Sequence, residues 1–307
     1  MSKAIRVAYG ETLAKLGHEN DKIVVLDADL SGATQTKFFK KEFPDRFYNI
    51  GIAEENLMGV AAGLAYQGFI PFASTFAVFG TGRAFEIVRN QIAYVNLNVK
   101  LALTHSGISV GEDGGSHQSI EDIALMRSLP NMTVVVPCDA IETEKAVRAA
   151  VNFAGPVYLR LARPAVDDVT SDNTEFKIGK ANVLKDGNDA CIIACGLMVG
   201  KALDAAKKLS ESGIDTAVIN MHTIKPLDKE TILKYNSKCK VIVTAEEHTI
   251  IGGLGSAVAE TIAGTNGSKF AMVGIEDKFG HSGNPDKLFE EYGLTTDNII
   301  KKVKENL

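Results

Sequence analysis

The chain has 307 residues, 45% of them hydrophobic, and a formal net charge of -5. This length is enough for two domains with substantial cores, and the lack of a basic surplus argues against nucleic acid as a partner. No apolar run reaches the ~18 residues of a membrane span, and residues 1–17 predict a capped amphipathic helix instead of a signal peptide, so we expect a cytoplasmic protein with no membrane partner.

Four cysteines are scattered along the chain, and only Cys191 and Cys195 are close in sequence. These two lie in an apolar run that predicts a buried strand. Together with Cys138 and Cys239 they are interpreted as buried reduced thiols, in preference to a metal or redox site.

The first half of the chain alternates short apolar runs with helical segments. Strands are predicted within residues 21–27, 46–54, 70–79, 99–107, 132–140 and 156–163. Helices are predicted within residues 1–17, 54–68, 83–94 and 142–153, and another begins at Ile120. This alternation predicts a doubly wound, mainly parallel α/β sheet over residues 1–164.

Residues 165–188 lose the apolar periodicity and are predicted to form a linker or an edge hairpin. The pattern then starts again, with strands predicted within residues 190–196, 215–221, 240–248 and 269–277. Helices are predicted within residues 199–213 and 255–264, and another starts from Asp228. A second doubly wound α/β domain is therefore expected over residues 189–307. The glycines of residues 252–255 lack the spacing of a dinucleotide-binding fingerprint and are interpreted as a packing turn.

Acidic side chains follow two of the predicted strands. Asp27 and Asp29 end the first strand, where parallel α/β sheets collect ligand-binding groups, although a polar turn that caps the next helix explains them more simply. Glu54 and Glu55 begin a helix whose small and apolar residues indicate packing on all sides. At least one of these carboxylates therefore starts at the rim of a core, where it needs hydrogen-bond partners.

The densest group of chemically active side chains lies in residues 104–118, THSGISVGEDGGSHQ. Between its glycines stand His105, Glu112, Asp113, Ser116 and His117. This composition favours proton transfer with hydroxylated substrates. The spacing of the two histidines matches no standard zinc site and no cysteine joins them, so metal ligation is disfavoured.

Phe76 and Phe79 lie three residues apart, with small residues between them and glycines after them. Core packing explains most phenylalanine pairs. Glycines beside aromatic residues after a strand also suit a flat ring that stacks on a phenyl face.

Taken in order, these stretches resemble the transketolase family. GIAEEN, STFAVF, LTHSGISVGEDGGSHQSIED and PCDAIET resemble the pyrimidine-binding domain of these thiamine diphosphate enzymes. MHTIKPLD, EEHTIIGGLGSAVAE and GHSGNPDKLFEEYGLT resemble their C-terminal domain. The resemblance covers nearly the whole chain, and it implies transfer of a two-carbon ketol unit from a ketose or ketose phosphate to an aldose or aldose phosphate.

The resemblance also implies residues that bind the cofactor. Glu54 matches the glutamate that hydrogen-bonds N1′ of the aminopyrimidine ring and so promotes loss of the thiazolium proton. Phe76 and Phe79 match the aromatic pocket around that ring, and Asp29 matches an acid beside the cofactor.

Substrate-binding residues follow from the same resemblance. His105 and His117 match histidines that handle the substrate hydroxyls and carbonyl group. Asp113 matches the acid that binds a substrate hydroxyl. Both histidines are therefore expected to act in catalysis together with Glu54.

One part of a thiamine diphosphate site is missing from the sequence. The resemblance would require a Gly-Asp-Gly motif followed at a distance by Asn, which together hold Mg²⁺ (or Ca²⁺) and the diphosphate, and no such pattern occurs in the chain. The resemblance therefore implies a split enzyme whose separate N-terminal subunit carries this motif and the metal. We expect this chain to supply no metal ligand, to be inactive alone, and to self-associate through both of its domains in a heterotetramer with that subunit.

Four positions depart from the pattern of full-length transketolases. Ala53 stands where an arginine usually precedes the glutamate, and Gly82 stands where a third aromatic residue lies near the pyrimidine. Val136 replaces an arginine that binds the acceptor phosphate, and Ala33 replaces a phosphate-binding serine. Recognition of a substrate phosphate is therefore left open.

The strand end that carries Arg160 and Arg163 also resembles that of the related deoxyxylulose-phosphate synthases and of the β subunits of 2-oxo-acid dehydrogenases. In those enzymes an arginine at this strand end lies near a substrate anion. Because these two residues alternate with apolar ones, a solvated or ion-paired strand face explains them equally well. Both families stay as alternatives, although a synthase holds all domains in one chain and the dehydrogenase subunit lacks a GEDGGSHQ block. A non-catalytic scaffold is a third alternative, which the joint presence of Glu54, Asp113 and His117 disfavours.

Overall fold

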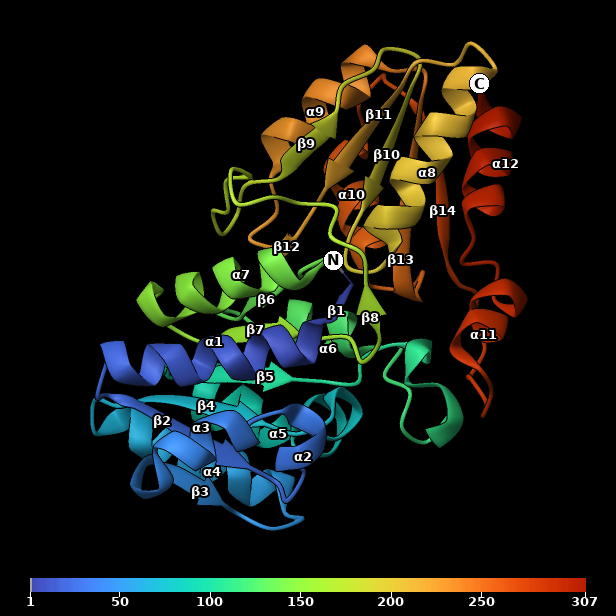
Figure 1. Ribbon diagram of the computed structural model, residues 1–307. Helices are drawn as coiled ribbons and strands as arrows, with labels where there is room; N and C mark the ends of the chain where they lie inside the picture. The colour runs from blue at the N-terminus through green and yellow to red at the C-terminus, as the bar shows by residue number, and fades with distance from the viewer. Residues whose placement is uncertain (1) are drawn as a thin grey trace.

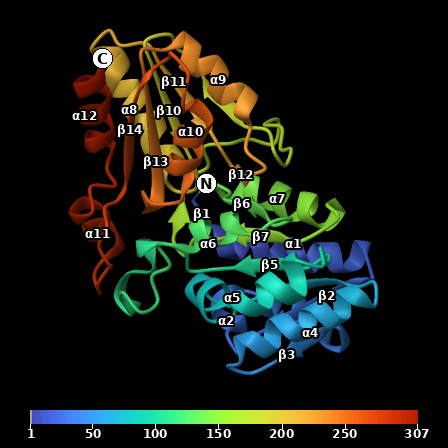
Figure 2. The same cartoon turned by 180° about the vertical axis from the view of Figure 1, so that it is seen from behind.

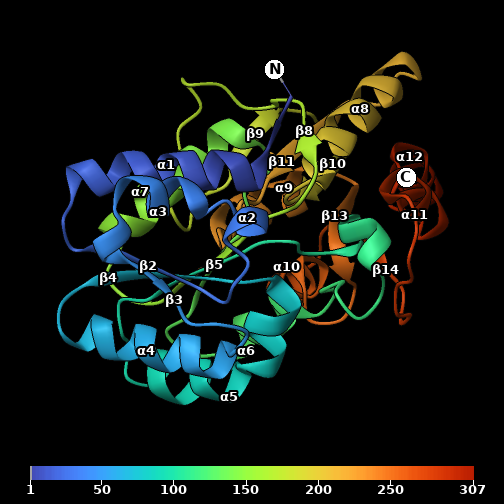
Figure 3. The same cartoon turned by 60° about the horizontal axis from the view of Figure 1, so that its bottom comes forward.

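The computed structural model describes residues 2–307, and it consists of two α/β domains that lie one above the other (Figures 1 and 2). The first is built on a seven-stranded sheet and the second on a five-stranded sheet. Both sheets are mainly parallel, and both are covered by helices on their two faces (Figure 3). The prediction of two doubly wound α/β domains is confirmed.

The seven-stranded sheet has the order β12-β6-β7-β5-β4-β2-β3. Its strands are β2 (Ile23–Asp27), β3 (Phe47–Asn49), β4 (Ile70–Ser74), β5 (Lys100–Leu103), β6 (Thr133–Val135), β7 (Val157–Arg160) and β12 (Thr223–Lys225). Only β12 runs antiparallel to its neighbour. A small separate ladder joins β1 (Lys3–Ala4) to β8 (Ala165–Val166).

Alternating residues of the central strands face two helical layers. Ile23 and Val25 pack in one buried cluster with the helices α1 (Ile5–Glu19) and α7 (Ala140–Asn152). Val24 and Leu26 pack in another cluster with α4 (Glu54–Tyr66) and α6 (Asp122–Ser128). The short helices of this domain are α2 (Ser31–Thr34), α3 (Lys37–Glu42) and α5 (Phe85–Ile87), the last of which lies between two π-helical turns, Phe79–Arg83 and Val88–Ala93. A strand buried on both faces needs apolar residues on both sides, and β2 has them at its first four positions, Ile23 to Leu26.

The five-stranded sheet has the order β14-β13-β10-β11-β9. Its strands are β9 (Asn182–Lys185), β10 (Ala190–Ala194), β11 (Thr216–Asn220), β13 (Val241–Thr249) and β14 (Lys269–Ile275). The helices of this domain are α8 (Met198–Glu211), α9 (Lys229–Lys238), α10 (Leu254–Ile262), α11 (Pro285–Glu291) and α12 (Thr296–Asn306). Buried residues of α8 and α12 cover one face of the sheet, and those of α9 and α10 cover the other.

Several elements differ from those expected. The strand expected over residues 70–79 ends at Ser74, because the chain turns there into the first π-helical turn. The first helix has no side-chain cap, since Ala4 occupies the N-cap position. Helix α4 is not packed on all sides: its side bearing Tyr66, whose side chain is 79% exposed, faces solvent.

The segment expected to be a linker contributes to the second sheet. β9 pairs antiparallel with β11 at the edge of this sheet, as a single edge strand and not as the hairpin that was the alternative to a linker. β12, which comes from the second half of the chain, pairs with β6 of the first sheet. Strand pairing therefore ties the two halves of the chain together.

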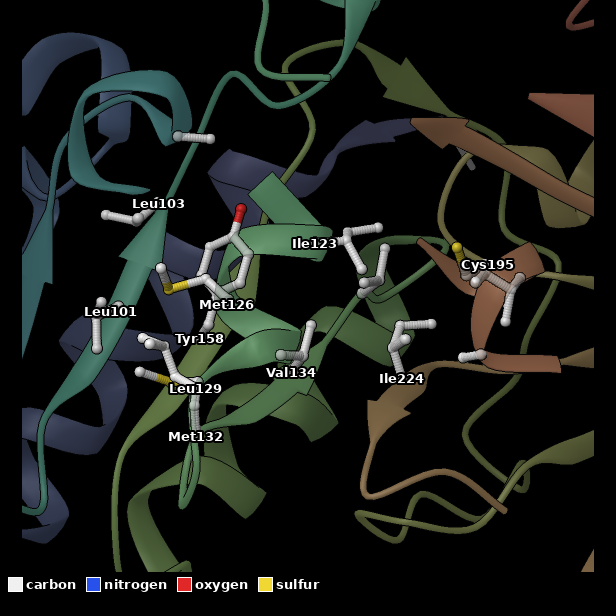
Figure 4. Close-up of a cluster of buried hydrophobic side chains, with 14 of the residues drawn as sticks. Leu101, Leu103, Ile123, Met126, Leu129, Met132, Val134, Tyr158, Cys195 and Ile224 are labelled. Atoms are coloured by element: carbon white, nitrogen blue, oxygen red, sulfur yellow. The ribbon is translucent and has the colours of Figure 1, made fainter. Parts of the chain in front are cut away.

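The hydrophobic core is also continuous between the domains. Figure 4 shows side chains of the first domain beside Cys195 and Ile224 of the second, and all of them belong to one buried cluster. All four cysteines are buried free thiols, as predicted. Within residues 2–307, no helix combines the length and the apolar character that crossing a membrane requires.

Candidate active site

The predicted site residues gather where the central strands of the first sheet end. Parallel pairing aligns Asp27 of β2 with Ser74 of β4 and with Asn49 of β3. Phe76 follows β4 and forms an isolated bridge with Thr104, which follows β5. This edge is the place where doubly wound sheets bind ligands.

Two phenyl rings and two imidazole rings form one cluster at this edge. The Phe76 ring stacks on His105 at 3.9 Å between centroids, and it lies 6.1 Å from the nearly parallel Phe79 ring. The His117 ring meets the Phe79 ring edge-on at 5.3 Å. The structure therefore brings together four residues that lie up to 41 positions apart in the sequence.

A local backbone feature sets the direction of the phenyl rings. After β4 the chain enters the π-helical turn Phe79–Arg83, a geometry that often occurs at functional sites. Gly80 lies so close to the sheet that a Cβ atom there would be 2.6 Å from Cδ1 of Leu103. The glycine thus lets the turn sit directly on β5, beside His105.

Glu54 is the first residue of α4 and is only 2% exposed, whereas Glu55 is exposed. The free N–H groups of the first helical turn favour a carboxylate at this position. An oxygen of Glu54 accepts a hydrogen bond from the guanidinium of Arg83 at 2.8 Å. Arg83 in turn lies over the Phe79 ring, 5.0 Å from its centroid, and thereby connects Glu54 to the ring cluster. Sequence reasoning missed this arginine.

His105 is buried in a left-handed backbone conformation, with φ of 58°. Residues other than glycine rarely adopt this conformation, and such strain is concentrated at functional sites. Its Nδ1 atom shares a hydrogen bond of 2.8 Å with the hydroxyl of Thr104. Burial, aided by the charges of Arg6 and Arg163, lowers the pKa of His105 to about 3. The imidazole is therefore neutral near pH 7.

The loop after β5 carries His117 and Asp113. Nδ1 of His117 lies 3.0 Å from the Ser116 hydroxyl, and its ring is partly buried against Phe79. Asp113 and Glu112 are exposed. The loop therefore presents one histidine to the ring cluster and two acids to solvent.

Asp29 lies at the same sheet edge and also has a left-handed backbone, with φ of 63°. Its carboxylate accepts a hydrogen bond of 2.8 Å from the Asn49 side chain. The neighbouring Asp27 is buried and accepts hydrogen bonds from the hydroxyls of Thr34 and Thr36. Of the two acids, Asp27 thus organises the turn and Asp29 is the one exposed at the edge.

The two arginines at the end of β7 have different surroundings. Arg160 is 4% exposed and ion-paired with Asp122, and it also donates to the carbonyl oxygen of Glu247 in the second domain. Its guanidinium is therefore used between the domains, which favours the ion-paired alternative over contact with a substrate anion. Arg163 is partly exposed, and donates to Glu112 and to the carbonyl oxygen of Val110.

Arg6, which sequence reasoning also missed, lies beside Arg163. Its Nε atom donates to the carbonyl oxygen of Arg163 at 3.2 Å. Burial and the charge of Arg163 both lower the pKa of Arg6. Two neighbouring cations thus lie near His105 in a chain that is acidic as a whole.

These residues fit a flat heteroaromatic ring that can exchange a proton. The Phe76 and Phe79 rings supply an apolar stacking face, and the buried Glu54 carboxylate supplies a hydrogen-bond partner at its side. Gly82 leaves open space, since no atom lies within 4 Å of its hypothetical Cβ. Among residues 2–307, no group of three or more His, Cys, Asp or Glu side chains is placed to hold a metal ion.

Comparisons with known proteins identify the family of the chain. Residues 1–168 match the family model of the transketolase pyrimidine binding domain, and residues 179–299 match that of the transketolase C-terminal domain. A protein of Methanocaldococcus jannaschii described as a transketolase C-terminal section is 50% identical over 99% of this chain and 96% of its own length. Transketolase of Rattus norvegicus is 40% identical over 98% of this chain, which spans only 48% of the rat protein.

A solved structure extends the agreement to three dimensions. It is described as a split gene transketolase, an inactive β4 tetramer, and is 53% identical with a TM-score of 0.93 over 99% of this chain and 98% of that one. The two domain models together match most of the chain, in the order found in the structure. The chain therefore belongs to the transketolase family.

Proposed function

We propose that the chain is one subunit of a split transketolase, which transfers a two-carbon ketol unit from a ketose or ketose phosphate to an aldose or aldose phosphate. The observation that carries the proposal is the buried Glu54 carboxylate, which Arg83 connects to the Phe79 ring of the parallel Phe76 and Phe79 pair. This arrangement fits the aminopyrimidine of thiamine diphosphate. When bound, that cofactor supplies the nucleophilic and electron-accepting chemistry that protein side chains lack.

Each residue of the ring cluster has a proposed role. Glu54 shares a proton with a ring nitrogen of the pyrimidine, because its carboxylate starts a helix and is shielded from water. The phenyl rings hold the pyrimidine flat and exclude water from its face. Asp29, at the same sheet edge, lies beside the cofactor.

The substrate end of the site is formed by the histidines and the adjacent loop. Neutral His105 and partly buried His117 hydrogen-bond the carbonyl and hydroxyl oxygens of the sugar and pass protons to and from them. Asp113 accepts a hydrogen bond from a substrate hydroxyl. Arg163, together with Arg6, attracts an anionic group of the substrate.

The diphosphate end of the cofactor requires a second subunit. The chain contains no Gly-Asp-Gly motif, and it spans about half of the rat transketolase that it matches. We therefore propose a partner subunit that carries this motif and holds Mg²⁺ or Ca²⁺ with the diphosphate. The active assembly is a heterotetramer in which this chain also self-associates through its two domains.

Reconstitution tests this function. The chain is mixed with a subunit that carries the Gly-Asp-Gly motif, thiamine diphosphate and Mg²⁺, and ketol transfer between a ketose phosphate and an aldose phosphate is followed. We expect activity from the mixture and none from either subunit alone or from the pair without cofactor. A correctly assembled pair with bound cofactor and no ketol transfer would refute the proposal.

A further inference from the structure

The loop that carries Asp113 and His117 is supported from outside its own domain. Figures 1 and 2 show the loop between β5 and α6 reaching out from the first domain to lie beside α11 of the second. Four glycines, at positions 107, 111, 114 and 115, punctuate it. Such a loop has little stiffness of its own, so its shape depends on what it contacts.

The segment Gly280–Pro285, which leads into α11, contacts the middle of this loop. The Ser282 hydroxyl donates to the carbonyl oxygen of Glu112 at 2.5 Å. The backbone amide of Gly283 donates to the carbonyl oxygen of Gly111 at 3.4 Å. The side chain of Gln118 donates to the carbonyl oxygen of His281 at 3.0 Å. These hydrogen bonds lie on both sides of Asp113 and His117.

The two backbones approach so closely that glycine is required. A Cβ atom at Gly280 would lie 1.9 Å from Oε1 of Gln118, and one at Gly115 would lie 2.5 Å from the carbonyl oxygen of Gly280. Contacts below 3.0 Å force atoms to shift. At Gly115 the neighbour is backbone, so a side chain there would push the two segments apart, whereas at Gly280 the neighbour is the end of the Gln118 side chain, which a methyl group would displace.

The segment itself is held firmly on α11. The Asn284 side chain caps α11 by accepting from the amide of Asp286 at 3.0 Å. Nε2 of His281 lies 2.9 Å from the Glu291 carboxylate, and the Tyr292 hydroxyl donates to the carbonyl oxygen of Phe279. The start of the loop is held by the same domain, because Glu247 of β13 accepts from the amide of Ser109 at 2.7 Å.

We propose that the segment Gly280–Pro285 is a positioning element for the active-site loop Gly107–Gln118. Through these contacts the C-terminal domain sets where Asp113 and His117 stand relative to the Phe76 and Phe79 rings. The inference rests on the proposed ketol transfer for its effect on substrate use, but its effect on the loop itself is independent of that activity.

Two variants test the inference. Gly280→Ala drives a methyl group against Gln118, and Ser282→Ala removes the hydrogen bond to Glu112. The matched controls are Gly200→Ala, whose Cβ would meet only Val169 at 3.8 Å, and Ser237→Ala, whose hydroxyl bonds within α9. Ser282→Thr keeps the hydroxyl and should behave as the wild type.

The first readout is amide hydrogen exchange of the chain alone. We expect exchange in residues 107–118 to be about tenfold faster in both test variants, with unchanged exchange in β10 and β13. The controls and Ser282→Thr should leave the loop unchanged. Unaltered exchange of the loop in Ser282→Ala and in folded Gly280→Ala would overturn the proposal.

The second readout uses the assembled pair. In both test variants we expect the KM for the sugar substrates to rise about tenfold or more, because the loop carries substrate-binding groups. The affinity for thiamine diphosphate should change by less than about twofold, because the phenyl rings do not move. Equal losses of cofactor and substrate binding would overturn the proposal. If the wild-type pair shows no ketol transfer, the proposed function fails while the exchange experiment still decides the inference.

Discussion

At the scale of single residues, the position of Arg163 yields a prediction about substrate charge. Arg6 donates to the carbonyl oxygen of Arg163, and the charges of both arginines lower the pKa of His105. We expect Arg163→Met to raise the KM for phosphorylated sugars about tenfold, because the variant loses an ionic hydrogen bond to the phosphate. The KM for the unphosphorylated sugars should stay within about twofold of the wild type, because these sugars carry no anionic group for Arg163 to bind. The exposed Arg89 provides the control variant, Arg89→Met. An equal rise for both kinds of sugar would show that Arg163 does not bind the anion.

Glu247 yields a prediction about pH. Burial raises the pKa of this carboxyl to about 7, although the charge of Arg160 and the amide of Ser109 favour the ionised form and Asp122 opposes it. The pKa of a glutamate in an unfolded chain is about 4.3. Between these values the folded chain keeps a proton that the unfolded chain has released, so the stability contributed by Glu247 falls as pH rises from about 4.3 to about 7.

Replacing Glu247 should therefore change the pH dependence of stability. We expect Glu247→Gln to raise the free energy of unfolding by about 1–3 kcal/mol at about pH 8 relative to the wild type, and to have little effect at about pH 4. Urea unfolding at both pH values measures this, with the exposed Glu290→Gln as control. The same gain at both pH values would contradict the assigned titration.

Residue identities were predictable only where they follow from a local pattern. The sequence placed Glu54, Phe76, Phe79, His105 and His117 in the site, and the structure brings the four aromatic and imidazole rings together. Arg6 and Arg83 could not be found in this way, because their partners lie far along the chain: Arg83 meets Glu54 across 29 residues. For Arg160 the sequence left an ion pair and contact with an anion equally open, since nothing near it in sequence reveals Asp122, its buried partner 38 residues away.

At the scale of elements, the π-helical turn after β4 determines the direction of the phenyl rings. Gly80 and Gly82 lie in this one turn, but only Gly80 faces a crowded surface, at Leu103. We expect Gly80→Ala to lower the free energy of unfolding by about 1–3 kcal/mol because the methyl group overpacks against β5. Gly82→Ala, which meets no neighbouring atom, should cost less than about 1 kcal/mol. Equal effects in thermal unfolding would remove the steric role of Gly80.

Elements with strong periodicity were predictable, and those defined by distant contacts were not. The buried strand β2 and the helix α8 follow from their apolar patterns. The three residues of β12 have no such pattern and form a strand only because β6 lies beside them. The helices α11 and α12 were not predicted, although Asn284 and Thr295 at their starts are local capping signals that sequence reasoning could have used.

At the scale of the whole molecule, a buried arginine that is ion-paired within the first domain also hydrogen-bonds the second domain. Arg160 binds Asp122 and also donates to carbonyl oxygens of Ser119 and Glu247. Removing one partner of such a pair leaves an uncompensated buried charge, so we expect Arg160→Met to lower the free energy of unfolding by about 3–5 kcal/mol. The double variant with Asp122→Asn should recover part of this loss. A single variant as stable as the wild type would show that the pair does not stabilise the fold.

The domain arrangement supports the proposal that the site needs another chain. The pyrimidine end of the proposed cofactor site lies at the edge of the first sheet, around Glu54, Phe76 and Phe79, and the second domain supports only the loop next to it. No residue pattern for the diphosphate end occurs in the sequence. The central claim is thus that this chain supplies the group that activates a cofactor held in part by a partner.

Ketol transfer by the assembled pair with Glu54→Gln tests that claim most directly. We expect kcat to fall by about 10²–10⁴-fold, because an amide cannot exchange the proton that a carboxyl group does, while the pair still assembles. Glu55→Gln, a change at the exposed neighbour, should keep nearly full activity. Near-normal turnover by the Glu54 variant would contradict the account, because it would remove the one buried carboxylate of the ring cluster from the reaction.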